Sequence, residues 1–323
     1  MLNSTDMLLR RRRIATTLTA AFALLALLAL LAVAGCGGVA SGTQMGTSNP
    51  GQERDATPVI LQPAQPGAAV VDNEKATLDY SNTADGYISV LSKLGVKVKV
   101  LVDVNDSQYQ YTINNAGSYI VIPLSCGDGT YTVGVWEHVT GETYASIFSQ
   151  DLSVSIADEY KPFLYPNQYV NYAAGDASTA ISQQYATGAT SDVEALNGIY
   201  KYVVENITYD YNKAATVQPG YLPNNTNTIN AKTGICFDYA VLTASLLREQ
   251  QIPAKLVIGY SDTAYHAWIT VFCKETGEVI GNYRFDGSSW QRMDPTFDAA
   301  SKGTQDLSGV IGSGTSYQPM FYY

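Results

Sequence analysis

The sequence predicts an α+β fold class, in which a small all-β sandwich precedes a domain of helices followed by a sheet. Short alternating or β-branched runs, separated by Asn, Asp and Gly turns, fill residues 76–156. Three helical stretches follow between residues 176 and 250, and strand-like runs come after them up to residue 297. Helices and strands that occupy separate stretches of the chain are typical of α+β domains.

Composition and charge limit the possible functions. The 323 residues are 46% hydrophobic, which is enough chain to bury one or two cores. The net charge of −10 repels phosphate backbones, so we expect no nucleic-acid partner. Four cysteines lie at positions 36, 126, 236 and 273, without metal-type spacing. The fold must therefore be stabilised by its hydrophobic core, because there are too few cysteines for a dense disulfide framework.

The first 36 residues have the order of an export signal. Four arginines precede the apolar run "IATTLTAAFALLALLALLAVAGC", which ends in small residues at Cys36. The ending "VAGC" resembles the lipobox of bacterial lipoproteins, and this resemblance implies that Cys36 carries a lipid anchor. An uncleaved membrane helix is the alternative, since about 20 apolar residues can cross a bilayer. Both interpretations export the rest of the chain, and the lipoprotein places it on the outer face of the bacterial cytoplasmic membrane.

Residues 37–75 are predicted to be a flexible linker, because they are rich in Gly, Ser, Pro, Gln and Ala with little apolar periodicity. The sandwich is expected over 76–156, with about seven strands. Pro162 and Pro166 break the strand pattern near its end. We therefore assign residues 157–323 to the second domain.

The second domain begins with helical patterns at 176–187 and 191–207. Ser191 is a predicted N-cap, and Glu194 three residues later completes a capping-box pattern. A polar loop over 211–234 then leads to a helix from Cys236 to Gln250. Strands are expected at 254–261, 266–273, 281–287 and 290–297.

Cys236 stands where the third helix is predicted to begin, just after Gly234. Unpaired backbone N–H groups and the positive end of the helix dipole would stabilise a thiolate there. The same N–H groups could accept the oxyanion of a tetrahedral intermediate. A buried structural cysteine is the alternative interpretation, because free cysteine is among the most buried residue types.

A nucleophilic cysteine needs a base, and the chain has only two histidines. His138 lies beside a turn in the predicted sandwich, whereas His266 begins a strand 30 residues after Cys236. Asp294 follows 28 residues later, near the end of another strand, where a carboxylate could fix the tautomer of the imidazole. The three groups needed for thiol catalysis therefore occur in order.

This ordered set resembles the transglutaminase-like superfamily, which has a papain-like Cys-His-Asp core. The resemblance rests on "GICFDYAVLTASLLREQQIPAKLVIGY", "YHAWITVF" and "WQRMDPTFD", with "IYKYVVENITYDY" upstream, and covers about residues 160–300. It implies that Cys236 is the nucleophile, His266 the general base and acid, and Asp294 the orienting carboxylate. For the upstream oxyanion partner of the family, Tyr209 is the candidate.

Several neighbours of these residues have structural alternatives. Asp238 suits the first turn of a helix because of the dipole, although it could also shape the site. Trp268 alternates with His266 along one strand and could line the site or pack in the core. Cys273 is expected on the opposite face, as a structural residue. Bridges among Cys126, Cys236 and Cys273 stay possible at this point.

The leading hypothesis is a cell-surface thiol enzyme that acts on amide bonds through a thioester, as a protease, amidase, deamidase or protein cross-linker. Envelope proteins or peptides would be its substrates, and the N-terminal lipid would bind it to the membrane. The alternative is a lipid-anchored binding or scaffold module of the same fold without activity. No cofactor is predicted, and no metal, since neither two separated histidines nor the scattered acidic residues have ligand spacing.

Overall fold

The structure is a computed structural model that describes residues 51–302 and 314–323. The predicted signal segment, the lipid-attachment residue Cys36 and residues 37–50 of the predicted linker lie outside these ranges. No helix within the described ranges is both long and apolar enough to cross a membrane.

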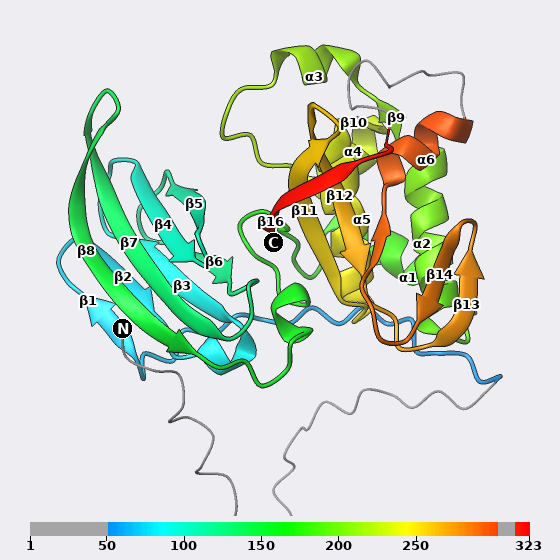
Figure 1. Cartoon of the computed structure of the whole chain (residues 1–323), viewed down its shortest axis with the longest axis horizontal. Coiled ribbons are helices and arrows are strands. Elements are labelled where there is room, and N and C mark those ends of the chain that lie inside the picture. The colour runs from blue at the N-terminus through cyan, green and yellow to red at the C-terminus, as the bar shows by residue number, and fades with distance from the viewer. Residues whose placement is uncertain (1–50, 303–313) are drawn as a thin grey trace, which may run out of the picture. The chain divides into compact units, whose positions relative to one another are not determined.

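The first region consists of two four-stranded antiparallel sheets, which face each other as a sandwich (Figure 1). Their orders are β1-β2-β3-β6 and β5-β4-β7-β8. The predicted all-β sandwich is confirmed, with one more strand at its start than the sequence suggested. The strands are β1 (Val70–Asp72), β2 (Ala76–Asp79), β3 (Tyr87–Ser92), β4 (Val98–Val104), β5 (Ser107–Ile113), β6 (Tyr119–Pro123), β7 (Gly129–Thr140) and β8 (Thr143–Val154).

Alternation along the strands builds the core of the sandwich. Val98, Val100 and Val102 of β4 are buried, whereas Asp103 is exposed to solvent. Because successive side chains of a strand point to opposite faces, this pattern directs one apolar row inward. A short 3-10 helix, η1 (Thr83–Asp85), connects β2 to β3, and η2 (Lys161–Phe163) follows the sandwich.

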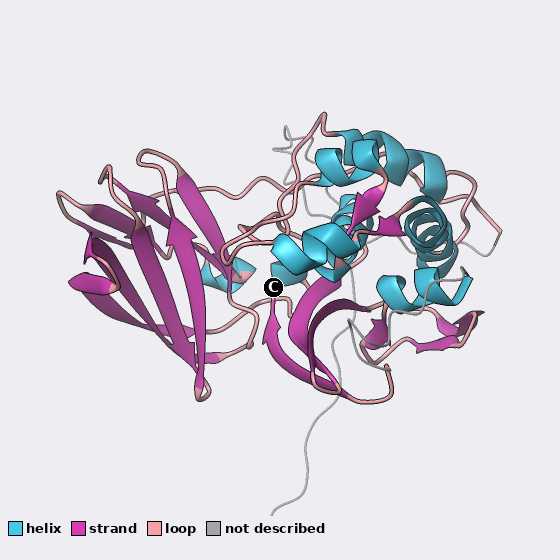
Figure 2. Ribbon diagram, turned by 90° about the horizontal axis from the view of Figure 1, so that it is seen from above, coloured by secondary structure: helices cyan, strands magenta, loops and turns pink. Residues whose placement is uncertain are grey.

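The second region places helices on one face of a four-stranded antiparallel sheet of order β15-β12-β11-β16 (Figure 2). This arrangement confirms the predicted α+β class. Its helices are α1 (Ala177–Ala186), α2 (Asp192–Asn206), α3 (Tyr211–Thr216), α4 (Asn225–Ala231), α5 (Cys236–Glu249) and α6 (Pro295–Lys302). Its strands are β9 (Thr208–Tyr209), β10 (Thr233–Gly234), β11 (Ala254–Ser261), β12 (Ala264–Val271), β13 (Thr276–Ile280), β14 (Tyr283–Asp286), β15 (Gln291–Met293) and β16 (Tyr317–Tyr322).

Helix α5 is the centre of this domain. It packs on β11 and β12 and is also contacted by α1, α2, α4 and α6. All of its residues from Asp238 to Glu249 are buried. Even Arg248 is fully buried, where its guanidinium donates to the backbone carbonyls of Tyr165, Ala254 and Tyr323. A buried charge needs such compensation, so Arg248 ties three separate segments to one helix end.

Side-chain caps determine where several helices of this domain begin. Ser191 caps α2, since its hydroxyl accepts from the N–H of Glu194. The Glu194 carboxylate, however, accepts from the N–H of Thr190, so the predicted capping box is shifted by one residue. The predicted loop over 211–234 contains α3 and α4, and that part of the prediction is wrong. Asn224 and Asp210 cap these short helices with their own side chains, a role that a reading of the segment as a polar loop overlooks.

The predicted flexible linker over 37–75 is wrong for its described part. Residues 54–69, which we call the strap, bind other segments along their length, and β1 follows directly. The N–H of Val59 donates to the carbonyl of Glu249 at 2.8 Å, and Gly67 N donates to the Asp79 carboxylate at 2.8 Å. Hydrogen bonds to other segments therefore fix the strap at several points despite its linker-like composition.

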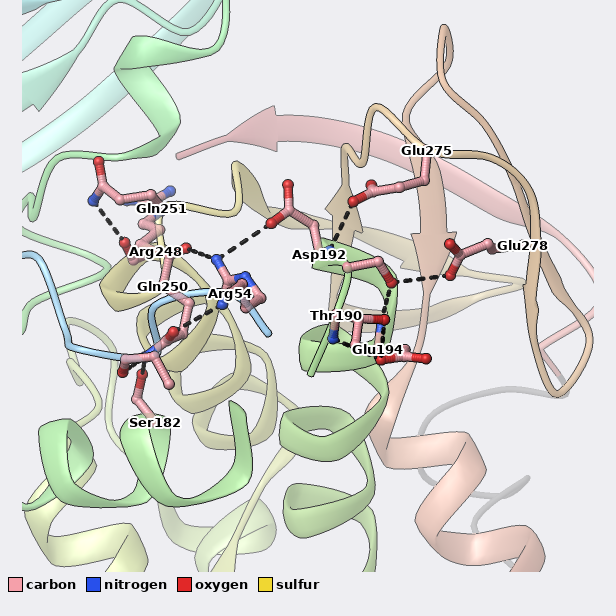
Figure 3. A network of polar contacts seen from close by, with 12 residues as sticks. Arg54, Ser182, Thr190, Asp192, Glu194, Arg248, Gln250, Gln251, Glu275 and Glu278 are labelled. Atoms are coloured by element: carbon pink, nitrogen blue, oxygen red, sulfur yellow. Dashed lines mark hydrogen bonds and ion pairs between the residues drawn. The ribbon is translucent and has the colours of Figure 1, made fainter. Parts of the chain in front are cut away.

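Arg54 anchors the start of the strap (Figure 3). Its guanidinium donates to the side chain and the carbonyl of Gln250, at 2.9 and 2.7 Å. It also pairs with Asp192, at 3.2 Å. Gln250 in turn donates to the carbonyl of Ala56 and to Ser182. One arginine thus joins the strap to the beginning of α2 and the end of α5.

Glu249, beneath the strap, is fully buried. One of its carboxylate oxygens accepts from Ser178 at 2.6 Å, and the other has no partner among the described residues. Burial raises the pKa of Glu249 to about 7, although hydrogen bonds from Ser178 and Ser182 oppose the shift. Folding therefore buries a charge once the pH exceeds this value.

We expect Glu249→Gln to stabilise the protein above pH 7 and to change little near pH 4.5. When folding raises the pKa of a carboxyl, the free energy of unfolding falls as the pH rises from the unfolded pKa to the folded pKa. The gain for the variant should reach about 3 kcal/mol at alkaline pH. Urea unfolding across this pH range measures it, with the exposed Glu142→Gln as control. An equal difference at both pH values would contradict the burial of an ionised Glu249.

Candidate active site

Cys236 is the first residue of α5, as the sequence predicts. Ile235 precedes it in an extended conformation as the N-cap, and the Cys236 side chain is partly exposed. Among the described residues the backbone N–H of Cys236 has no acceptor, because it belongs to the first turn of the helix. Sulfur and a free N–H donor are therefore contributed by the same residue.

His266 lies in β12, opposite Gly259 of β11, and is 1% exposed. Its Nε2 is 2.7 Å from Oδ2 of Asp294, which matches the predicted pairing of these two residues. Trp268 stacks against the imidazole, with ring centroids 6.0 Å apart, and Phe297 meets it edge-on at 5.5 Å. The aromatic rings confine the imidazole to one orientation.

Asp294 sits between the end of β15 and the start of α6. Its Oδ1 accepts from the N–H groups of Thr296 and Phe297, at 3.1 and 3.2 Å. Its Oδ2 accepts from Tyr317 at 2.8 Å as well as facing His266. With both oxygens occupied, the carboxylate is held as an acceptor, which requires a proton on Nε2 of His266. The other ring nitrogen, Nδ1, is left for Cys236.

The pKa of His266 indicates that the Cys236 sulfur lies close to the imidazole. Burial alone would lower the pKa of His266, but the Asp294 carboxylate and then the neighbouring Cys236 sulfur raise it to about 10. Nδ1 of His266 makes no well-aligned hydrogen bond among the described residues. The sulfur is thus close to the ring without being aligned with it. Such contacts are often long before substrate binds and tighten in the reacting complex.

Tyr209, the predicted oxyanion partner, is buried beside Cys236. Its strand β9 pairs in parallel with β10, and this places Tyr209 opposite Gly234. Burial raises the pKa of Tyr209, and the charge of Cys236 raises it further. The hydroxyl is therefore a neutral donor at physiological pH, and the structure brings it near the sulfur.

The sequence did not reveal Tyr317 as a member of this site. Its strand β16 follows residues 303–313 in the chain and pairs with β11, so no local pattern connects it to Asp294. Trp268 is 2% exposed and packs against the imidazole, which settles its role as support for the ring. Tyr265 is 60% exposed and lies close enough to Cys236 for the charge of the sulfur to raise the pKa of Tyr265, after burial and Tyr260.

The other candidate residues lie elsewhere. The three described cysteines are free, which rules out the bridges that the sequence left possible among them. Cys126 contacts the Tyr109 hydroxyl in the sandwich, and burial raises the pKa of the Cys273 thiol. His138 contacts the carbonyl of Gly141 in the β7–β8 turn. Within the described ranges, no group of three or more His, Cys, Asp or Glu side chains could hold a metal ion.

A central helix that starts at a cysteine and packs on a sheet bearing a His–Asp pair defines the class of papain-like thiol-enzyme folds. Residues 179–295, which contain all three residues, match the family model of the transglutaminase-like superfamily, and this part of the chain belongs to that superfamily.

The chain is also similar to individual proteins, over limited regions or at low identity. A UPF0252 protein of Methanocaldococcus jannaschii is 33% identical over 97 residues, which cover 26% of this chain and 28% of that relative's length. A structure from Cytophaga hutchinsonii, described as a candidate cysteine protease, has 14% identity, a TM-score of 0.36 and coverage of 72% and 73% of the two chains. Red sea bream transglutaminase has 13% identity, a TM-score of 0.29 and coverage of 65% and 48%. The family assignment rests on the matched segment and on none of these similarities.

We expect the imidazole of His266 to titrate near pH 10 in the folded protein, and Asp294→Asn to bring this value below the ordinary 6.5. Burial then opposes the charge without the carboxylate to offset it. Nuclear magnetic resonance of the two imidazoles measures both values, and His138 serves as the internal control. Titration of His266 near 6.5 in both proteins would contradict the pairing.

Proposed function

We propose that the protein is a thiol acyl-transfer enzyme that cleaves amide bonds through a thioester on Cys236. The observation that carries this proposal is the orientation of His266. Its Nε2 is occupied by Asp294, and its Nδ1 remains for the sulfur, whose proximity helps to raise the pKa of the ring. An imidazolium beside the sulfur favours the thiolate, which is the attacking species.

The reaction would proceed in two halves. The Cys236 thiolate, paired with the His266 imidazolium, forms a bond to the carbonyl carbon of a carboxamide, and the electron pair of the C=O double bond moves to the oxygen. His266 then gives its Nδ1 proton to the leaving nitrogen as the C=O bond re-forms and the C–N bond breaks, which leaves a thioester and a free amine or ammonia. Water as the second acceptor gives proteolysis or deamidation, and a lysine amine gives a cross-link. Asp294 holds the imidazole in the required tautomer throughout.

Negative charge on the carbonyl oxygen would be stabilised by two donors. The N–H of Cys236 has no acceptor among the described residues, and Tyr209 is a neutral hydroxyl near the sulfur. Donors that are fixed before the reaction cost no reorganisation when the charge develops. Tyr209 is therefore our candidate for the side-chain half of the oxyanion hole.

We further propose that the substrates are proteins or peptides of the cell envelope. The predicted export signal and the lipid on Cys36 would place the enzyme on the outer face of the cytoplasmic membrane. The exposed ring of Tyr265 near the sulfur suits an apolar side chain of an extended peptide. Hydrolysis is our first expectation for the fate of the thioester.

The second candidate is a lipid-anchored scaffold of the same fold without activity. The sandwich would then be the binding part, and the Cys-His-Asp set would be unused. The occupation of all three positions and the buried His266–Asp294 contact weigh against this alternative, since a buried ionic pair is costly to maintain without a role.

We expect the exported part of the chain to change envelope peptides and Cys236→Ala to abolish the change. Mass spectrometry distinguishes loss of ammonia, a new isopeptide link and a new terminus, and each result names one reaction. Cys126→Ala should keep full activity because its thiol lies in the sandwich. Activity that survives Cys236→Ala would refute the enzymatic proposal.

Tyr209→Phe should lower kcat by about 10- to 100-fold and change KM little, because the lost donor acts on the transition state. Steady-state kinetics on the peptide identified above measure this split. Tyr239→Phe is the comparison, since its buried hydroxyl donates to the carbonyl of Ile207. A rise in KM with unchanged kcat would instead place Tyr209 in substrate binding.

A further inference from the structure

Asp238 is a fully buried carboxylate two residues after Cys236. Its Oδ2 accepts from the N–H of Ile235 at 2.8 Å and pairs with Nζ of Lys213 at 2.7 Å. Its Oδ1 accepts from the hydroxyl of Tyr221. A favourable interaction with the helix dipole explains a carboxylate at this position, but it does not explain two partners from a distant segment.

Both partners come from the segment that connects β9 to β10. Lys213 belongs to α3 and also donates to the hydroxyl of Tyr221 at 2.7 Å, with its ammonium 4.4 Å from the centre of that ring. The start of the segment is fixed separately, because Asp210 N donates to the carbonyl of Gly234 at 2.9 Å. Residues 208–222 are thus bound at two places to residues 234–238, which form the start of α5 and the turn before it.

Asp238 binds the residue before the nucleophile through the Gly234–Ile235 peptide. Ile235 has its N–H bound by the Asp238 carboxylate, and its carbonyl accepts from Tyr239 at 3.1 Å. Both backbone groups of the residue before Cys236 are therefore fixed. The carbonyl of Ile235 and the N–H of Cys236 lie in one rigid peptide plane, so the direction of that N–H follows from the bond between the carbonyl and Tyr239.

Gly234 adds an independent sign that this arrangement is tight. A Cβ placed on Gly234 would lie 2.6 Å from Cβ of Asp238, a separation that side chains do not adopt. The Asp238 side chain therefore folds back over a position that only glycine can fill.

We propose that Lys213 and Tyr221 are positioning residues for acyl transfer, which hold Asp238 and through it Ile235, the residue whose carbonyl shares a peptide plane with the Cys236 N–H. This inference rests on the proposed function for its catalytic consequence. Removing Lys213 leaves a buried carboxylate without its cation, which strongly destabilises the local structure. The first turn of α5 then loses the fixed geometry on which a preorganised oxyanion site depends.

Amide hydrogen exchange tests the structural half without any substrate. In Lys213→Met we expect peptides that cover residues 208–222 and 233–239 to exchange about tenfold faster, while peptides of the sandwich stay unchanged. Lys201→Met is the matched control, because Lys201 is exposed and its Nζ lies 4.0 Å from the carboxylate of Glu205 in the same helix. Unchanged exchange in Lys213→Met would overturn the proposal.

Two further variants keep the test sharp if Lys213→Met folds poorly. Tyr221→Phe removes one hydroxyl and should give a smaller change in the same peptides. Lys213→Met combined with Asp238→Asn removes both charges, so exchange should return toward that of the natural protein. Additive effects of the two substitutions would show that the residues do not act as a pair, and would also overturn the proposal.

Kinetics test the catalytic half. In Tyr221→Phe and Lys213→Met we expect kcat to fall about tenfold with little change in KM, since the substrate still binds. Faster exchange with an unchanged kcat would overturn the positioning role. Absence of turnover in the natural protein would count against the proposed function alone, and exchange would then decide whether Lys213 and Tyr221 hold this peptide.

Discussion

The buried contact between His266 and Asp294 is the constraint on which the rest of the site depends. A carboxylate and an imidazole that face each other away from water must keep their partners, because separating a buried ionic pair costs several kcal/mol. Main-chain donors at the start of α6 and the Tyr317 hydroxyl from β16 occupy the remaining positions of the carboxylate. Helix α6, β12 and β16 are therefore held in one arrangement by a single side chain.

Helix α5 connects the site to segments near both ends of the described chain. Cys236 begins the helix beside the imidazole. At the other end, Arg248 donates to the carbonyl of Tyr323, which directly follows β16, and the C-cap residue Gln250 binds the strap. Because residues Asp238–Glu249 are buried and α5 packs on β11 and β12, the helix holds the backbone of Cys236 in a fixed position relative to the sheet. Segments that lie far apart in the sequence thus converge on one element.

Local signals in the sequence predicted the parts of the fold that depend on neighbours in the chain. The Ser191 cap, the start of α5 at Cys236 and the strands around His266 each follow from a few adjacent residues. The order of cysteine, histidine and aspartate predicted which side chains would meet. The two short helices α3 and α4 were missed because Asn and Asp side chains cap them within a segment that reads as polar loop.

The remaining features depend on contacts between distant residues. Arg54 binds Gln250, 196 positions away, so the strap has the composition of a linker and the structure of a fixed segment. Tyr317 reaches Asp294 only because β16 pairs with β11. Lys213 and Tyr221 find Asp238 through the pairing of β9 with β10. No periodicity or motif encodes these meetings.

The pH dependence of alkylation of Cys236 by iodoacetamide tests the central claim most directly, since it needs no substrate. The account predicts that near pH 6 Cys236 reacts about tenfold faster than Cys126, because an imidazolium stabilises the thiolate, and that His266→Ala removes this advantage. Peptide mass spectrometry reports each thiol separately. Equal rates for Cys236 in the natural protein and in His266→Ala would contradict the account.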